Sequence, residues 1–168
     1  RALVERIAAE VPGCAIGADV MAGFPGEDDG SFAGTVRLIE DLPLAYLHVF
    51  PYSRRPGTPA ADLPDQVDDG VKKERAAVLR DLGRRKREAF AARFVGREVT
   101  VLLEDRRDRE TGFRKGFSGE YVPVVVINGE ERHVNRMVPV VPLEAREGTL
   151  VGAIGAPDPA AAGRPEGP

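Results

Sequence analysis

The sequence predicts an α/β region followed by a small all-β barrel, and three observations lead to this fold class. Apolar patterns typical of helices and of strands alternate through about the first 55 residues, as in βαβ units with a parallel sheet. A basic segment with helical spacing follows. After Gly96 the apolar period changes from that of a helix to that of short strands. We therefore divide the chain into an α/β region (1–70), a basic linker helix (71–96), a β-barrel (97–155) and a disordered tail (156–168).

The α/β region begins with a helix and a strand. Leu3, Ile7 and Val11 share one helix face, and Pro12-Gly13 then ends the helix. The run from residue 14 to residue 22 is almost continuously apolar, which predicts a strand buried on both faces of a parallel sheet.

A second helix and a second strand follow. Asp28 or Asp29 can cap a helix whose apolar face reaches Ile39, and Tyr46–Phe50 has the composition of a strand. Two strands do not form a stable open sheet by themselves. Because the chain also begins without Met, we expect it to be the C-terminal part of a longer protein.

The barrel region contains alternating apolar segments, and Asn128-Gly129 predicts a hairpin turn between two of them. Its strands are expected at 98–103, 121–127, 136–141 and 148–154, with a fifth possible. The segment before the second strand places Phe113, Phe117 and Tyr121 among cations. Aromatic rings stack on bases and cations contact phosphates, which favours binding of single-stranded RNA. The alternative is that Phe117 and Tyr121 fill the barrel core, and we expect this of one of the two.

Charge is distributed unevenly, although the formal net charge is only −3. Residues 1–70 carry 5 Lys/Arg and 12 Asp/Glu, whereas residues 71–93 carry 9 and 3. The basic segment is a candidate contact for a polyanion, and the alternative is a solvated helix. One cysteine, Cys14, excludes an internal disulfide and a cysteine-only metal site. With no long apolar run and no secretion signal, we expect a cytoplasmic protein without membrane contact.

Chemistry in the α/β region is predicted at the turn after the first strand. Residues 23–27 join the carboxyl end of a strand to a helix start, where free N–H groups and the helix dipole can hold a ligand. The alternative is an ordinary turn. Asp19, in an apolar strand, is either paired with an Arg or functional, and His48 is interpreted as a core histidine. We assign no catalytic residue and no metal ligand to this chain.

Three segments together resemble the radical S-adenosylmethionine methylthiotransferases. They are Ile16–Glu27 (IGADVMAGFPGE), Tyr46–Thr58 (YLHVFPYSRRPGT) and Gly116–Val124 (GFSGEYVPV). The resemblance implies that residues 1–70 are the last part of a (β/α)6 partial barrel and that residues 97–155 are a TRAM domain. The second segment, with His-Val-Phe-Pro-Tyr-Ser, is most similar to the branch that modifies threonylcarbamoyladenosine beside the tRNA anticodon.

The resemblance also implies an activity, cofactors and site residues. The family adds a methylthio group at C2 of a modified adenosine, using S-adenosylmethionine and two 4Fe-4S clusters. The cysteines that hold those clusters in the family have no counterpart here, so the chain alone is expected to be inactive. The implied cofactor-binding residues are Asp19, Met21, Gly23, Phe24, Pro25, Gly26, Glu27, Phe50, Pro51 and Tyr52.

The expected partner is tRNA, gripped at its anticodon stem-loop. The RNA-binding residues would be Arg54, Arg55, Lys72, Lys73, Arg84, Arg85, Arg114, Lys115, Phe117 and Tyr121. One alternative is a non-catalytic RNA-binding protein whose α/β part is only a scaffold. Another is a methylthiotransferase that acts on isopentenyladenosine in tRNA or on a ribosomal protein.

Overall fold

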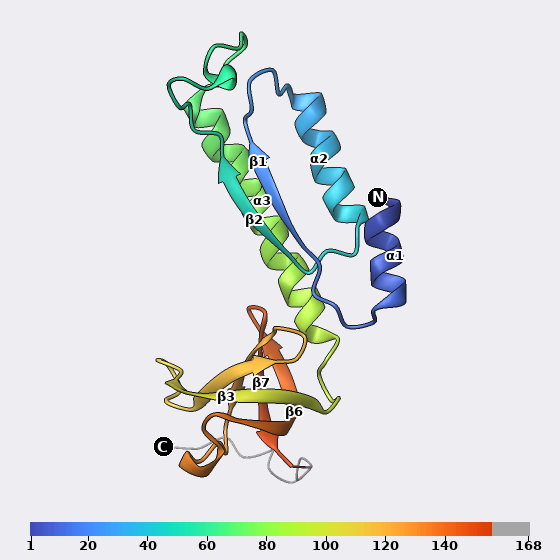
Figure 1. Cartoon of the computed structure of the whole chain (residues 1–168), viewed down its shortest axis with the longest axis vertical. Helices are drawn as coiled ribbons and strands as arrows, with labels where there is room; N and C mark the ends of the chain where they lie inside the picture. Colours follow the sequence, from blue (N-terminus) through green and yellow to red (C-terminus); the bar gives the residue numbers. More distant parts are fainter. Residues whose placement is uncertain (156–168) are drawn as a thin grey trace, which may run out of the picture. The chain divides into compact units, whose positions relative to one another are not determined.

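The computed structural model describes residues 1–155, and the chain divides into two compact units, Arg1–Arg87 and Glu88–Pro168. The first unit contains α1 (Ala2–Glu10), β1 (Gly17–Ala22), α2 (Asp29–Asp41), β2 (Tyr46–Pro51), the 3-10 turn η1 (Pro59–Ala61) and most of α3 (Asp69–Ala92) (Figure 1). The second contains β3 (Val99–Arg107), β4 (Arg114–Ser118), β5 (Pro123–Val126), η2 (Glu131–His133), β6 (Arg136–Arg146) and β7 (Thr149–Ile154). The expected disordered tail, 156–168, lies outside the described residues.

In the first unit, β1 and β2 form a parallel two-stranded sheet. Gly17 pairs with Tyr46 at one end and Ala22 with Pro51 at the other. The core lies between this sheet and the helices α2 and α3, which confirms the predicted alternation of helices and strands (Figure 1). The buried residues are Ala22, Ile39, Leu42, Leu44, Leu47, Ala76, Leu79 and Leu82.

The prediction that the first strand is buried on both faces is wrong for the described residues. Exposure alternates along β1, because the helices cover only one of its faces. Gly17, Asp19 and Met21 lie on the uncovered face, while Ala18, Val20 and Ala22 turn toward the core. The apolar composition of β1 therefore leaves the unit with an open face that is partly apolar.

In the first unit, α2 begins at a capping side chain and α3 packs closely against β2. Asp28 accepts a hydrogen bond from the Ser31 N–H at 2.7 Å, and this capping bond lowers the pKa of Asp28. Gly83 lies inside α3, where glycine weakens a helix. A Cβ at Gly83 would lie 3.2 Å from the Leu47 Cβ, so the glycine lets α3 approach β2 closely. Of the helices in residues 1–155, none is long and apolar enough to cross a membrane.

The second unit is a closed barrel with the strand order β3-β4-β5-β7-β6. β5 and β7 run parallel and the other pairs are antiparallel. Six side chains without solvent exposure fill its interior: Val101, Leu103, Val124, Val126, Val140 and Leu150. The small β-barrel predicted from the change of period is thus confirmed.

Two local predictions for the barrel are corrected. Asn128-Gly129 forms a turn, but it does not close a hairpin, because β5 pairs with β4 and β7 and the chain continues into η2. The Asn128 side chain instead binds the Ile154 backbone: its Nδ2 donates to the Ile154 carbonyl oxygen at 3.0 Å, and its Oδ1 accepts from the Ile154 N–H at 2.8 Å. The fifth strand is β4, whose sequence was interpreted as an RNA-binding segment.

Candidate functional site

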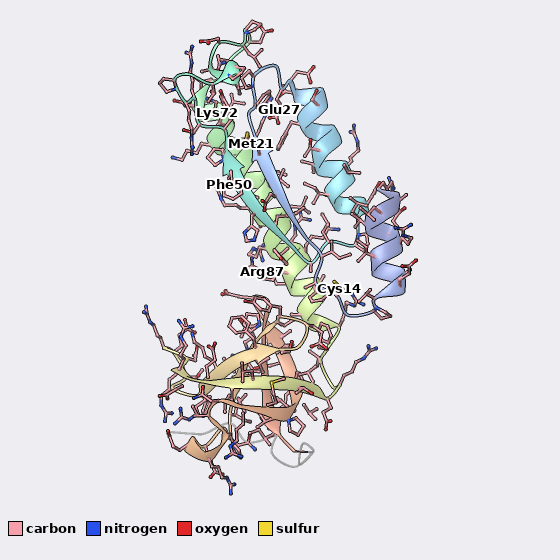
Figure 2. The ribbon with its side chains drawn as sticks, in the orientation of Figure 1. Cys14, Met21, Glu27, Phe50, Lys72 and Arg87 are labelled. Atoms are coloured by element: carbon pink, nitrogen blue, oxygen red, sulfur yellow. The ribbon has the colours of Figure 1, made fainter. Side chains whose placement is uncertain are left out.

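The open face of the two-stranded sheet brings together residues of both motifs. Met21 pairs in register with Phe50, and these side chains are 51% and 52% exposed (Figure 2). Asp19 pairs with His48 on the same face. Within residues 1–155 neither has an ion-pair partner, and His48 contacts the Tyr46 ring edge-on at 5.3 Å. The open face therefore combines an apolar patch with a carboxylate and an imidazole.

Two expectations about this face are corrected. His48 is exposed rather than a core histidine, because its side of β2 carries no covering helix in the described chain. The alternative in which Asp19 is satisfied by an arginine is not found within residues 1–155. An exposed carboxylate without a partner remains available to a ligand.

The turn after β1 is held by an internal clamp. The Gly23 N–H donates to Glu27 Oε1 at 2.9 Å, and the same oxygen accepts from Arg75 Nη1 at 2.8 Å. Arg75 also donates to the Glu27 carbonyl oxygen at 2.9 Å and to Asp29 Oδ1 at 2.7 Å. The Glu27 carboxylate is thus occupied within the fold, and its predicted cofactor role stays a prediction.

Arg75 is the residue at this turn that sequence reasoning missed. Its pKa is raised chiefly by the hydrogen bond to Asp29 and also by Glu27, while burial acts against the charged form. The ion pair of Arg75 with Glu27 contributes more to stability than the pair with Asp29, because Asp29 is fully exposed and water screens the second pair. The sequence did contain a signal for Arg75: this cation lies four positions after Val71 and four before Leu79, on the apolar face of the helix.

The remaining residues predicted around the cofactor separate into two places. Phe24 follows β1 and packs edge-on against Tyr52, with ring centroids 5.5 Å apart. Pro25 lies in the same turn, and the Gly26 N–H donates to the Asp65 carbonyl oxygen. Pro51 and Tyr52 line a pocket beside α3, whereas Phe50 lies on the open face. The three consecutive residues are therefore not brought to one surface.

The cations predicted to bind RNA also separate. Arg54, Lys72 and Lys73 line the pocket beside α3, and Arg55 does not. Arg84 and Arg85 are exposed on α3 and both contact Asp81, at 2.8 and 3.2 Å. These two arginines lower the pKa of Asp81, Arg84 most strongly through its hydrogen bond.

In the barrel the predicted RNA-binding residues have opposite environments. Arg114 is buried and forms ion pairs with Asp105 and Glu131, so its charge is neutralised within the fold. We therefore leave Arg114 out of the RNA-binding surface proposed below. Lys115 and Phe117 lie on the outer side of β4.

The expectation that one aromatic ring fills the barrel core is wrong. Phe117 is half-buried, Tyr121 is 78% exposed, and the two rings stack with centroids 5.2 Å apart. Phe117 pairs in register with Leu102, which pairs with Met137 on β6, and both of these are exposed. This row across three strands, with Tyr121 on Phe117, is called the apolar row below.

Residues 1–155 contain no group of three His, Cys, Asp or Glu side chains that could hold a metal ion. Cys14 lies exposed in the connection between α1 and β1 (Figure 2). The residues that the structure describes therefore do not offer the set of side chains that an iron–sulfur cluster needs.

Comparison with known proteins adds one finding. A tRNA-2-methylthio-N(6)-dimethylallyladenosine synthase of Thermobifida fusca (strain YX) is 43% identical over 117 residues. That relative is a tRNA-modifying enzyme. The match covers 70% of this chain but only 24% of the relative, so the chain spans about a quarter of that protein's length. No protein-family model matches the chain. The similarity to tRNA methylthiotransferases is confirmed, and the branch with threonylcarbamoyladenosine as substrate stays a prediction.

Proposed function

We propose that this chain is the C-terminal part of a tRNA methylthiotransferase, which adds a methylthio group at C2 of a modified adenosine. The observation that carries the proposal is 43% identity with the Thermobifida fusca synthase over 70% of this chain. The positions of the three sequence motifs in the fold also support the proposal. The first two contain β1 and β2 and continue past the carboxyl ends of these strands, where ligands bind in α/β folds. The third contains the end of β4, the turn after it and the start of β5.

The open face of β1 and β2 is proposed to hold part of S-adenosylmethionine, which supplies the methyl group and the radical in this family. Met21 and Phe50 offer an apolar surface on which an adenine ring can stack. Asp19 lies beside them with a free carboxylate that can accept hydrogen bonds from ribose hydroxyls. The cluster ligands would then belong to parts of the enzyme outside this chain.

The barrel is proposed to be a TRAM domain that contacts the tRNA anticodon stem-loop through the apolar row. Tyr121 has a φ of 64°, a left-handed conformation that bulky residues rarely adopt. Its N–H closes the turn by donating to the Ser118 carbonyl oxygen at 2.9 Å. No packing within the core explains an aromatic ring at this exposed position, and such strain often accompanies function. Stacked rings with Lys115 nearby suit an unpaired base and its phosphate.

For the substrate we propose threonylcarbamoyladenosine, on the His48–Ser53 segment that resembles this branch. Dimethylallyladenosine is the second candidate, because it is the nucleoside in the name of the Thermobifida fusca relative. The two nucleosides carry different groups on N6, so their methylthio products differ in mass and can be measured separately.

Disruption of the gene that encodes this chain, followed by mass spectrometry of the tRNA nucleosides, tests the function and the substrate together. We expect the methylthio form of threonylcarbamoyladenosine to disappear while the unmodified parent accumulates, and a plasmid copy to restore it. Loss of the methylthio form of dimethylallyladenosine instead would establish the second candidate. If both products persist, the tRNA methylthiotransferase proposal fails, and an RNA-binding protein or a ribosomal-protein enzyme remains.

A further inference from the structure

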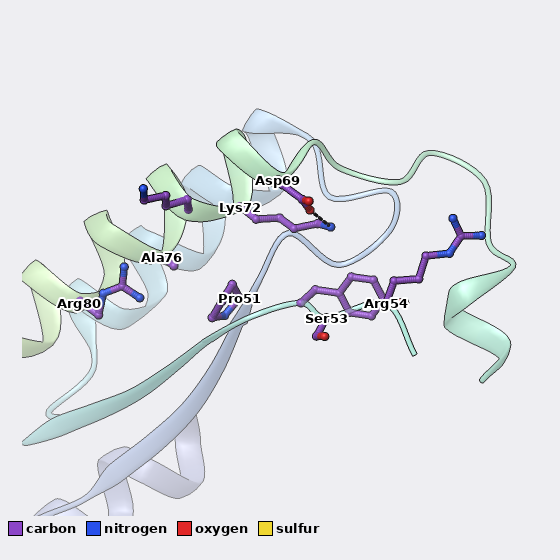
Figure 3. Close-up of a pocket in the computed structure, with 9 residues that line it drawn as sticks. Pro51, Ser53, Arg54, Asp69, Lys72, Ala76 and Arg80 are labelled. Carbon is purple, nitrogen blue, oxygen red and sulfur yellow. Dashed lines mark hydrogen bonds and ion pairs between the residues drawn. The ribbon is translucent and has the colours of Figure 1, made fainter. Parts of the chain in front are cut away.

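A cationic pocket of about 520 Å³ lies where β2 ends and α3 begins (Figure 3). It is on the side of the sheet that faces α3, away from the open face proposed for the cofactor. Its lining residues are Pro51, Tyr52, Ser53, Arg54, Asp69, Lys72, Lys73, Ala76 and Arg80. The five α3 residues lie close together on the helix surface, because each is three or four positions from at least one other, as Asp69 is from Lys72 and Lys73.

The charges of this pocket are poorly balanced by the chain itself. Arg54, Lys73 and Arg80 have no ion-pair partner within residues 1–155. Lys72 is the exception: its Nζ lies 3.0 Å from Asp69 Oδ1 (Figure 3). The Asp69 side chain is almost completely exposed, so water can replace it in that pair at little cost. Four cations and one exposed carboxylate form a site suited to an anion.

Tyr52 gives independent support for a missing ligand. Tyr52 is only 8% exposed, and its hydroxyl is buried without a hydrogen-bond partner among residues 1–155. Buried hydroxyl groups are normally hydrogen-bonded, so one that lines a pocket without a partner indicates a group that binds there. The Lys72 ammonium lies 5.4 Å from the centre of the Tyr52 ring. Tyr52 and Lys72 thus both line the pocket, and their hydroxyl and ammonium groups are both donors for an oxygen of a bound anion.

We propose that this pocket binds a backbone phosphate of RNA. Guanidinium, ammonium and phenol groups all donate hydrogen bonds, and phosphate oxygens accept several at once. Part of this inference rests on the proposed function, which supplies a tRNA partner. The volume exceeds what one phosphate needs, so the flanking sugars of a strand also fit. Free inorganic phosphate shares the same oxygen chemistry and is the other possible source.

The test uses the complete 168-residue chain and a fluorescent synthetic anticodon stem-loop RNA, with binding measured by anisotropy across a salt series. Tyr52→Phe removes only the hydroxyl group, and we expect about tenfold weaker binding. The thermal midpoint of Tyr52→Phe should equal or exceed that of wild type, because the lost hydroxyl has no partner in the part of the chain that the structure describes. A purely structural role for Tyr52 would lower the thermal midpoint instead.

Arg80→Gln and Arg37→Gln form a matched pair, each removing one exposed arginine from the first unit. Arg80 lines the pocket, whereas Arg37 lies on α2 and does not. Arg80→Gln should weaken binding about three- to tenfold and reduce the salt slope by about 0.7–0.9, the value for one phosphate contact. Arg37→Gln should remain within about twofold of wild type, because only long-range attraction changes.

A second arm adds inorganic phosphate alone and follows the thermal midpoint of wild type and Tyr52→Phe. If phosphate stabilises only wild type while both pocket variants bind RNA normally, the site is one for free phosphate and the RNA assignment is overturned. Absence of RNA binding by wild type, or equal binding by wild type and all variants, also overturns it. Failure of the proposed function is separate, since it appears as unchanged methylthio nucleosides after gene disruption.

Discussion

The clamp at the turn after β1 permits a sharp test by Arg75→Met. The substitution retains an unbranched side chain that can still pack against Phe32, whose ring lies 5.3 Å from the guanidinium. It removes the positive charge and three hydrogen-bond contacts of 2.7–2.9 Å. Glu27, with a side chain only 13% exposed, then keeps its negative charge, and within residues 1–155 its remaining hydrogen-bond donor is the neutral Gly23 N–H.

The expected loss of unfolding free energy is about 3 kcal/mol. Removal of one partner from a buried ion pair costs about 3–5 kcal/mol, because the other charge stays buried and uncompensated. We take the lower end, since Glu27 retains its bond to Gly23 and some contact with water. The exposed pair with Asp29 adds at most about 1 kcal/mol. Adding Glu27→Gln to Arg75→Met should recover about 1–2 kcal/mol, because it removes that buried charge.

Urea unfolding followed by circular dichroism is the suitable assay. The chain contains no tryptophan, and α1, α2 and most of α3 lie in the first unit, so the helical signal reports on that unit. Arg87→Met is the control, the same exchange at an exposed position of the same helix (Figure 2), and it should stay within about 0.5 kcal/mol of wild type. A loss below about 1 kcal/mol in Arg75→Met, or no recovery in the double variant, would refute the clamp.

Three further predictions concern the turn after β1, the apolar row and the N-cap of α2. Gly23→Ala should cost about 2–4 kcal/mol, because its φ of 76° strains Ala and the new Cβ would lie 2.3 Å from the Lys72 Cγ. Gly26→Ala, with a similar φ but open space, should lose only about 1 kcal/mol in the same urea series. Tyr121→Ala should weaken RNA binding about tenfold in the anisotropy assay without changing the thermal midpoint; equal affinity would exclude base stacking there. Asp28→Asn should match the stability of wild type at neutral pH and resist acid better. The cap bond lowers the folded-state pKa of Asp28 below its ordinary 3.8, so the ionised carboxylate stabilises the fold above pH 3.8 and this stabilisation is lost as the pH falls further. Parallel curves of thermal midpoint against pH for the two proteins would contradict this.

The cationic pocket belongs to the first unit and the apolar row to the second, and the two offer RNA different kinds of contact. The pocket offers cations and one hydroxyl, which recognise the backbone and carry no base specificity. The apolar row offers stacked rings, which hold unpaired bases. Salt should therefore weaken the contact of the pocket more than that of the row.

Local signals were sufficient for most elements of the fold. The spacing of Leu3, Ile7 and Val11 predicted α1, and the change of period after Gly96 predicted the barrel. These signals depend on residues close in sequence, so they can be interpreted without the partners. β4 was missed because its sequence, Arg114–Ser118, contains charges and glycine that suggest a loop. Only the barrel explains the glycine. A Cβ at Gly116 would lie 2.0 Å from the Leu102 carbonyl oxygen, so β3 and β4 can approach each other there only without a side chain.

The candidate sites were predicted less completely. Asp19, Met21 and Phe50 were named from motifs, and the register of the parallel sheet placed them on one face. Arg54, Lys72 and Lys73 were named from charge, and the fold collected them in one pocket. Arg80 was not predicted, because nothing local distinguishes it from the other arginines of α3. Arg114 was predicted as an RNA contact, yet its alternation on β4 turns it inward onto two carboxylates.

By itself, the sequence determined the order of helices and strands, the change from α/β to barrel and the family resemblance, because each depends on neighbouring residues or contiguous motifs. Only the tertiary structure decided which charges are free and which are neutralised. Arg75 and Glu27 are 48 positions apart, and no local pattern reveals that they meet. The same holds for the Tyr52 hydroxyl, whose lack of a partner is a property of everything packed around it. Burial and pairing are set by long-range contacts, and these depend on the complete fold.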